Sequence, residues 1–370
     1  MITTQIDYLD IRHRLLRWYK QHARDLPWRQ TSDPYAIWIS EVMLQQTQVE
    51  TVIPYYQRFL KRLPMVEKLA RARLDTVLKL WEGLGYYGRA RNLHKAAKVI
   101  TTELGGIFPD TREGLQQLPG IGRYTAGAIA SIAFNQAEPL VDGNVARVFC
   151  RLFYLDRDPK SQDMQRQLWS IATELVQGRE PGHLNQALME LGALVCRSQQ
   201  PDCSHCPLQS RCLAFHQEAQ DKLPLASPKK LVPAYTVALG IIWHQGKILI
   251  DQRKPEGHLG GLWEFPGGKR QGREAIKHTL IREVREEIGI EITVKKHLMI
   301  VDHAYSHFRV HLHVYECDYL SGKPTAKDCV QIKWVTPTQL KRYAFPGANQ
   351  VMIERIIEES KLSTQAVPRP

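Results

Sequence analysis

Residues 196–212 read CRSQQPDCSHCPLQSRC, and these four cysteines constrain the fold more than any other stretch of the chain. Their spacing is Cys196-x6-Cys203-x2-Cys206-x5-Cys212. Four thiolates in one short loop suit either a tetrahedral zinc ion or a 4Fe–4S cluster. Zinc ribbons usually pair two short knuckles, whereas this loop has one short gap and two longer ones. The pattern therefore predicts a metal centre whose spacing differs from that of a zinc ribbon.

The chain before this loop is expected to be almost wholly helical. Apolar residues recur at spacings of three and four in YLDIRHRLLRWY (8–19) and LDTVLKLWEGLG (74–85). Asp33-Pro34 predicts a helix start with proline at the first position, and Asp110 with Glu113 predicts a capping box. We therefore predict an all-α domain over residues 1–216.

The character of the sequence changes after Cys212. The stretch DKLPLASPKKLVP is rich in proline and lysine, which indicates an interdomain linker over 217–233. Strand-like runs and one helix follow, which predicts an α/β (α+β) domain over 234–362 and a disordered tail over 363–370. The strands are expected in YTVALGIIW (235–243), KILIDQR (247–253) and FRVHLHVYECDYL (308–320), and the helix in EAIKHTLIREVREEIG (274–289).

The formal net charge of +12 favours a polyanionic partner such as nucleic acid. No apolar run approaches the roughly 20 residues that span a bilayer, and the first residues carry no signal-peptide pattern. Seven cysteines in total, an odd number, argue against a disulfide framework. We expect a cytoplasmic, bacterial-type, nucleoid-associated monomer that does not contact membranes.

The segment LPGIGRYTA (118–126) joins one helical pattern to the next. Glycines at Gly120 and Gly122 let backbone amides approach a phosphate, and the following helix N-terminus adds its positive dipole. The element resembles a helix-hairpin-helix, which contacts DNA backbone rather than base sequence.

Taken with the helix LNQALMELGALVC (184–196), the cysteine loop and the glycine hairpin resemble the endonuclease III and MutY superfamily of DNA glycosylases. The block SEVMLQQTQV (40–49) resembles the MutY-type adenine glycosylases within it. The resemblance covers roughly residues 7–215. It implies a DNA N-glycosylase with a 4Fe–4S cluster on the four cysteines.

Two carboxylates are the predicted catalytic groups. Glu41 lies in a helix among apolar residues, where burial would raise its pKa and suit it to protonate adenine. Asp142, in VDGNVAR (141–147), is expected at a helix start that favours an anion beside the oxocarbenium-like sugar. By resemblance, Tyr124 and Asn144 support Asp142. Tyr124 also occupies the position of the endonuclease III lysine, which implies a monofunctional glycosylase without strand cleavage.

The resemblance also implies how the base is reached after it flips out of the duplex. Gln46 and Tyr86 would wedge into the base stack, with Leu84 nearby and Gly120 and Gly122 on the backbone. The residues expected to line the adenine pocket are Arg24, Leu26, Trp28, Arg29, Val49 and Gln186. For Leu26 and Trp28, ordinary core packing is almost equally expected.

The second domain resembles the MutT-like domain with which MutY enzymes read 8-oxoguanine. The loop AYSHF (304–308) would place Tyr305, Ser306 and His307 at that base. The domain also contains a complete Nudix box, Gly268-x5-Glu274-x7-Arg282-Glu283-x2-Glu286-Glu287-x-Gly289. Its acids Glu283, Glu286 and Glu287 lie on one helix face and form a possible Mg²⁺ site.

The sequence therefore predicts excision of adenine from A:8-oxoguanine and A:G mispairs in duplex DNA, as part of base excision repair. The Nudix box leaves two alternatives open. It is either a relic in a domain used for lesion recognition, which we favour, or it makes the chain bifunctional by hydrolysing oxidised dNTPs.

Overall fold

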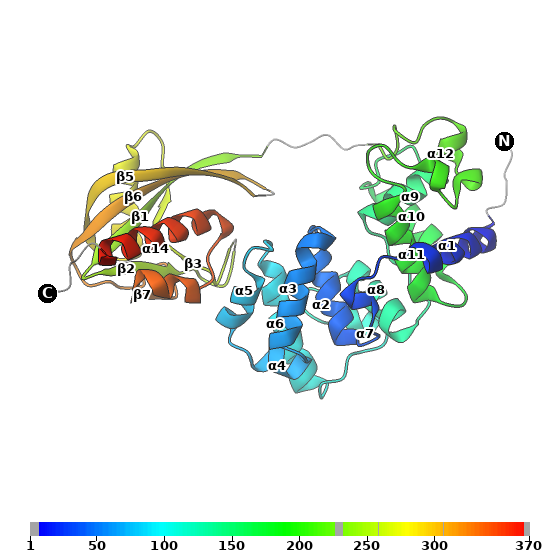
Figure 1. The fold of residues 1–370 in the computed structure, drawn as a ribbon, viewed down its shortest axis with the longest axis horizontal. Helices are drawn as coiled ribbons and strands as arrows, with labels where there is room; N and C mark the ends of the chain where they lie inside the picture. Colours follow the sequence, from blue (N-terminus) through cyan, green and yellow to red (C-terminus); the bar gives the residue numbers. More distant parts are fainter. Residues whose placement is uncertain (1–6, 226–231, 258, 306, 366–370) are drawn as a thin grey trace. The chain divides into compact units, whose positions relative to one another are not determined.

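The computed structural model describes residues 7–225, 232–257, 259–305 and 307–365. Contacts within the described chain form two units (Figure 1). The helical unit comprises residues 7–71 and 95–225. The sheet unit comprises residues 72–94 and 232–365, so a short segment from the first half of the sequence packs with the second half.

The helical unit contains no strand among its described residues, as the apolar spacing predicts. Helix α6 (Gly88–Glu103) begins in the sheet unit and continues into this one. The other helices of the unit are α1 (Tyr8–His22), η1 (Pro27–Arg29), α2 (Pro34–Leu44), α3 (Val49–Arg62), α4 (Val66–Arg71), α7 (Arg112–Gln116), α8 (Arg123–Phe134), α9 (Gly143–Leu152), α10 (Gln162–Val176), α11 (Pro181–Leu194), η2 (Cys203–His205), η3 (Gln209–Arg211) and α12 (Leu213–His216).

Of the two predicted helix starts, the first is confirmed and the second is wrong by one residue. Asp33 caps α2 by accepting a hydrogen bond from the Tyr35 amide at 3.0 Å, and Pro34 is the first helical residue. Helix α7 is capped by Thr111, whose hydroxyl accepts from the Gly114 amide at 3.2 Å. The side chain of Glu113 pairs with Arg112 instead of completing a capping box.

One core of the helical unit lies between α1, α9, α10 and α11, where buried apolar residues form a single cluster. Gly192 brings α11 against the start of α9, because a Cβ there would lie 2.6 Å from the Asn144 Cβ. This close approach places the first turn of α9 beside α11. Part of the predicted linker also packs on this unit, since Leu223 is buried and its carbonyl accepts from Arg151 Nε at 2.9 Å.

The sheet unit is built on a mixed seven-stranded sheet with the order β3-β2-β1-β6-β5, in which β4 pairs with β1 and β7 with β2. The β1–β6 pair is parallel and the other pairs are antiparallel. The strands are β1 (Ala234–His244), β2 (Lys247–Gln252), β3 (Trp263–Glu264), β4 (Gly267–Lys269), β5 (Glu291–Ala304), β6 (Arg309–Ser321) and β7 (Gln331–Val335). The three predicted strands are therefore confirmed as β1, β2 and β6.

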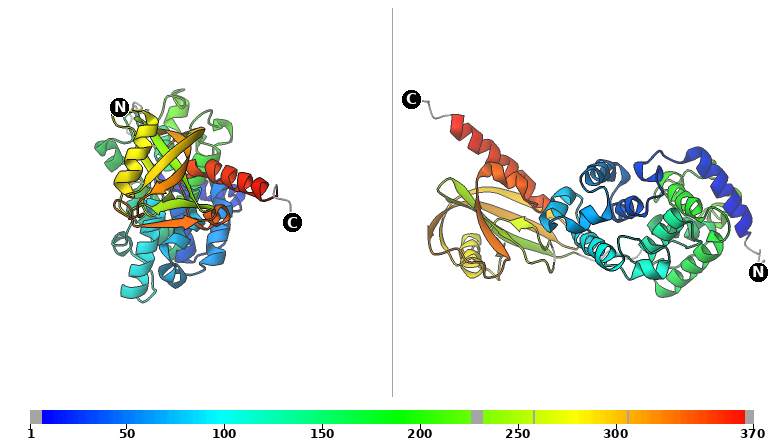
Figure 2. Two further views of the ribbon diagram at one scale, coloured as in Figure 1. Left: turned by 90° about the vertical axis from the view of Figure 1, so that its left-hand side faces the viewer. Right: turned by 90° about the horizontal axis from the view of Figure 1, so that it is seen from below.

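Two helices cover opposite faces of this sheet (Figure 2). Helix α13 (Ile276–Glu287), the predicted helix, packs on Ala238, Ile242 and Leu249, and α14 (Gln350–Gln365) packs on the face with Leu239 and Ile241. The unit also contains α5 (Leu74–Trp81), η4 (Pro337–Arg342) and η5 (Gly347–Asn349). Helix α14 extends past residue 363, where the predicted tail begins, and residues 366–370 lie outside the described part of the chain.

Within the described ranges, each helix is either too short or too polar to cross a lipid bilayer.

Candidate active site

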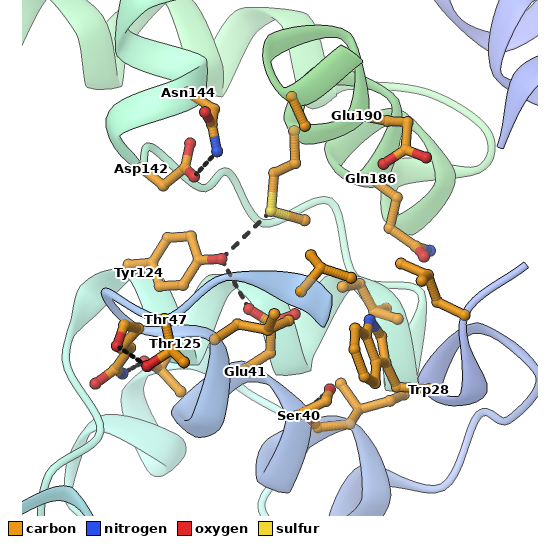
Figure 3. Close-up of a pocket in the computed structure, with 18 of the residues that line it drawn as sticks. Trp28, Ser40, Glu41, Thr47, Tyr124, Thr125, Asp142, Asn144, Gln186 and Glu190 are labelled. Carbon is orange, nitrogen blue, oxygen red and sulfur yellow. Dashed lines mark hydrogen bonds between the residues drawn. The ribbon is translucent and has the colours of Figure 1, made fainter. Parts of the chain in front are cut away.

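A pocket of about 690 Å³ opens in the helical unit between α2, α8, α11 and the loops that precede η1 and α9. It gathers residues that are far apart in sequence, and all four predicted catalytic side chains reach it (Figure 3). The predicted site residues that line it are Arg24, Leu26, Trp28, Arg29, Glu41, Gln46, Val49, Gly120, Gly122, Tyr124, Asp142, Asn144 and Gln186.

Glu41 lies on the buried face of α2 with 5% of its surface exposed. Burial raises the pKa of its carboxyl to about 7, although the hydrogen bond from Tyr124 acts in the opposite direction. The Tyr124 hydroxyl donates to Glu41 Oε2 at 2.8 Å and also lies 3.3 Å from Met189 Sδ. Glu41 is therefore a carboxylic acid that still holds a proton near neutral pH.

Asp142 is the N-cap of α9 and accepts hydrogen bonds from the Val145 amide at 2.7 Å and from Asn144 Nδ2 at 3.0 Å. Burial raises the pKa of Asp142, and the hydrogen bonds from Val145 and Asn144 oppose that rise. The predicted helix start is present, but desolvation influences the pKa of Asp142 more than the hydrogen bonds at that helix start do. Tyr124 projects between Glu41 and the Asp142–Asn144 pair (Figure 3).

The pocket contains a third carboxylate, Glu190, that the sequence reading does not single out. Its side chain is 1% exposed and binds Arg24 and Arg29, each with a closest N–O distance of 2.8 Å. Burial acts to raise the pKa of Glu190, but the hydrogen bonds from Arg29 and Arg24 outweigh it and hold the pKa at about 2. One signal was available: Glu190 follows Gln186 by one helical turn and is the single charged residue of LNQALMELGAL (184–194).

The glycine hairpin joins α7 to α8 at the rim of this pocket. Gly120 has a φ of +78°, a conformation that favours glycine, and Gly122 is the N-cap of α8. Gln46 also has a positive φ, +57°, in the exposed turn after α2. A non-glycine residue held in this region is strained and often marks a functional loop.

A second pocket, of about 490 Å³, lies within the sheet unit. It brings Tyr86 together with Tyr305 and His307, three residues that the sequence assigns to DNA and lesion contacts. Tyr86 is 39% exposed with a φ of +48°, whereas Leu84 is 5% exposed and packs inside. Ser306, the third residue of the predicted lesion loop, lies outside the described residues.

The four cysteines of the 196–212 loop line one small cavity next to Arg151. Arg151 donates to Cys196 Sγ at 3.4 Å. Among the described residues, no three acids, histidines or cysteines are gathered as ligands of a single ion would be. The four thiols that line this cavity are soft ligands of the kind that an iron–sulfur cluster or a zinc ion requires.

The Nudix box forms the loop after β4 and most of α13. Arg282 is central to it and ion-pairs with Glu274 at 2.8 Å, and with Glu283 and Glu286 at 2.9 Å each. Glu287 points inward, where burial and then the neighbouring carboxylate of Glu264 raise its pKa to about 8. Within the described residues, the three predicted Mg²⁺ ligands are therefore not gathered around one ion position.

Comparisons with known proteins match two regions of the chain to different families. The HhH-GPD superfamily of base excision DNA repair proteins matches residues 39–174, and the NUDIX domain matches residues 237–355. The chain is 38% identical over 412 residues to the adenine DNA glycosylase of Rattus norvegicus, covering 97% of this chain and 80% of that protein. It is 36% identical over 299 residues to the adenine DNA glycosylase of Buchnera aphidicola subsp. Acyrthosiphon pisum, covering 80% and 83% respectively.

Among solved structures, the chain resembles that of a thermostable thymine-DNA glycosylase, with a TM-score of 0.53 and 29% sequence identity. The match covers 57% of this chain and 97% of that one.

Proposed function

Since this chain belongs to the family of adenine DNA glycosylases, which are DNA N-glycosylases of base excision repair, we propose that it removes adenine paired with 8-oxoguanine, or with guanine, in duplex DNA. Family membership confirms the resemblance read from residues 40–49 and 196–212. The two matched families also confirm the predicted fold class, a helix-hairpin-helix domain followed by a Nudix-like domain. The observation that carries the proposal is the buried acid Glu41 in a pocket of about 690 Å³.

Glu41 is proposed as the general acid. Adenine leaves poorly until N7 is protonated, so the acid must hold a proton at neutral pH. Burial of Glu41 and the resulting pKa of about 7 meet that requirement. The Tyr124 hydroxyl, which donates to Oε2, fixes the orientation of the carboxyl group. Its own pKa is raised well above 10 by burial and by Glu41, so it remains a donor.

Asp142 is proposed to stabilise the positive charge that develops on the sugar as the base departs. Its two oxygens are fixed by Val145 and Asn144, so the carboxylate is oriented before the reaction begins. Glycosidases divide labour between two carboxylates in the same way, one protonated and one ionised.

Arg24 and Arg29 are proposed to contact the flipped adenine from the opposite wall. Glu190 holds both guanidinium groups in place before the base arrives. Binding therefore loses less side-chain conformational entropy than it would with two mobile arginines. Leu26, Trp28, Val49 and Gln186 complete the wall. The apolar members of this set suit a flat aromatic base.

The base opposite adenine is proposed to be read in the sheet unit, where Tyr86, Tyr305 and His307 line one pocket. Aromatic side chains bind bases by stacking, and His307 adds a hydrogen-bonding group. Gln46 and Tyr86 are proposed to fill the stack that the flipped adenine leaves. Gly120 and Gly122 are proposed to bind the DNA backbone through their amides.

Strand cleavage is not part of the proposed activity. A lyase needs an amine to form a Schiff base with the sugar, and the position after the hairpin holds Tyr124 instead. The product is therefore an abasic site in an uncut strand.

Cys196, Cys203, Cys206 and Cys212 are proposed to hold a 4Fe–4S cluster. When bound, the cluster supplies rigid cross-links between four points of the loop. Because the proposed hydrolysis needs an acid and water but no electron transfer, we assign the cluster a bracing role near DNA. Replacing Cys203 with serine should lower iron and sulfide from about four of each per chain and weaken binding of a duplex. Unchanged iron content in that variant would contradict the assignment.

The Nudix-like domain is proposed to recognise the lesion rather than to hydrolyse nucleotides. Arg282 pairs with Glu283 and Glu286, so a guanidinium already engages two of the three predicted Mg²⁺ ligands. Incubating the full-length chain with Mg²⁺ and 8-oxo-dGTP should yield no monophosphate. Formation of monophosphate that is lost in a Glu286→Gln variant would establish the bifunctional alternative instead.

The proposed substrate is tested with a panel of duplexes that carry A:8-oxoguanine, A:G, T:G or thymine glycol. Abasic sites, revealed by alkali, should form in the first two only. Release of thymine or of thymine glycol, or failure to release adenine opposite 8-oxoguanine, would contradict the proposal.

A further inference from the structure

Residues 72–94 contain helix α5, the loop that carries Tyr86 and the start of α6. This segment, called the bracket below, packs within the sheet unit. Val77, Leu78 and Trp81 on α5 are fully buried. Leu78 packs so closely on Gly261 that a Cβ there would lie 3.1 Å from Leu78 Cδ1. The bracket is thus part of the hydrophobic packing of the unit.

Specific hydrogen bonds attach the bracket to the backbone of residues 343–345. Glu82 Oε1 accepts from the Phe345 amide at 2.9 Å, and the Tyr87 hydroxyl donates to the Phe345 carbonyl at 3.3 Å. Lys79 Nζ donates to the Tyr343 carbonyl at 2.8 Å and ion-pairs with Glu82. The amide and the carbonyl of Phe345 are therefore both hydrogen-bonded to the bracket.

Residues 343–345 are themselves attached to the sheet. The Ala344 carbonyl accepts from the Trp263 amide in β3 at 2.8 Å, and the rings of Phe265 and Phe345 lie 5.4 Å apart. Ala344 and Phe345 are almost completely buried. The contacts of Glu82 and Tyr87 therefore connect the bracket to a fixed part of the sheet.

The same bracket holds the Tyr86 loop at its other end. Arg89 donates to the Leu84 carbonyl at 3.1 Å and the Gly85 carbonyl at 3.2 Å. Its guanidinium lies 5.4 Å from the ring centres of both Trp81 and Tyr86. The Tyr87 hydroxyl, which binds Phe345, also accepts from the Gly83 amide at 3.3 Å.

From this continuous set of contacts we propose that Glu82 and Tyr87 are positioning residues that fix the Tyr86 loop relative to Tyr305 and His307. Tyr86 and the lesion loop share one pocket, so the position of one determines what fits against the other. Glu82 and Tyr87 thereby contribute to the preference for 8-oxoguanine over guanine. The inference rests on the proposed function, because it assumes that this pocket reads the base opposite adenine.

The test is the single-turnover rate of adenine release by the full-length protein, measured opposite 8-oxoguanine and opposite guanine. Glu82→Ala removes the acceptor for the Phe345 amide, and Tyr87→Phe removes the hydroxyl between Gly83 and Phe345. Each should lower the ratio of the two rates about tenfold, while release opposite guanine stays within about twofold. Glu82→Gln keeps an acceptor and should restore most of the ratio. Glu103→Ala, an exposed change on α6, is the matched control.

A general loss of folding would lower both rates together and leave the ratio unchanged, and that result overturns the positioning role. Variants that keep the wild-type ratio overturn it as well. A wild-type protein that releases no adenine opposite 8-oxoguanine overturns the proposed function itself, and the inference with it. These failures are distinguishable because the first two leave the wild-type activity intact.

Discussion

At the scale of single residues, adenine release depends on the pH range in which Glu41 holds its proton. Because burial raises its pKa to about 7, the rate of adenine release should fall as the pH rises through that value. The Tyr124 hydrogen bond lowers that pKa, so Tyr124→Phe should move the alkaline limb to higher pH. The measurement is the single-turnover rate from pH 5 to about 9. A limb that moves to lower pH in the variant would contradict the assigned contact.

The burial of Glu41 also makes the free energy of unfolding depend on pH. The folded pKa of Glu41 lies above its ordinary value of 4.5, so the protein should lose stability as the pH rises from 4.5 to about 7. Glutamine at this position cannot ionise. Glu41→Gln should therefore be more stable than wild type above pH 7, by on the order of 3 kcal/mol, with the difference vanishing near pH 4. Denaturant unfolding at both pH values measures it. Equal stabilities at pH 8 would show that Glu41 is not desolvated as described.

Glu41 and Asp142 were predictable as site carboxylates from the sequence, and Glu190 was not. The first two stand in recognisable blocks, SEVMLQQTQV and VDGNVAR. Glu190 becomes part of the site only in the folded chain, where Arg24 and Arg29, more than 160 positions away in sequence, donate hydrogen bonds to it. The spacing from Gln186 marks the position of Glu190, but it does not identify the two arginines that pair with it.

At the scale of elements, the active site depends on how closely α11 approaches the start of α9. Gly192→Ala would place a methyl group 2.6 Å from the Asn144 Cβ, so the helices must separate. We expect a loss of about 1–3 kcal/mol in stability and a slower reaction, because Asn144 orients Asp142. At Gly143 a Cβ would meet nothing within 4 Å, so Gly143→Ala should change stability by no more than about 0.5 kcal/mol. Equal effects of the two changes on stability would contradict the packing argument.

The elements that the sequence predicts well are those with a strong periodic pattern. Strands β1, β2 and β6 alternate or run apolar, and α13 has a clear apolar face, so each was expected close to its observed bounds. Strand β5 was not expected, because many of its positions are exposed and its register shifts twice near His297. Its pairing with β6 determines its structure more than its own sequence does.

At the scale of the whole molecule, the two-part organisation was predictable from the change in composition after Cys212. The packing of residues 72–94 with the sheet unit was not, because their pattern, LDTVLKLWEGLG, indicates only an amphipathic helix and not its partner. Local sequence determines the element. Complementary contacts such as Glu82 with the Phe345 amide determine where it packs.

The central claim is that Glu41 delivers the proton that releases adenine. The most direct measurement compares wild type with Glu41→Gln on an A:8-oxoguanine duplex, scoring adenine release under single turnover and duplex affinity in parallel. Glu174→Gln, an exposed change on α10, serves as the control. The account predicts that Glu41→Gln releases no adenine yet binds the duplex within a few-fold of wild type, and that the control behaves as wild type. Normal turnover by Glu41→Gln would contradict it.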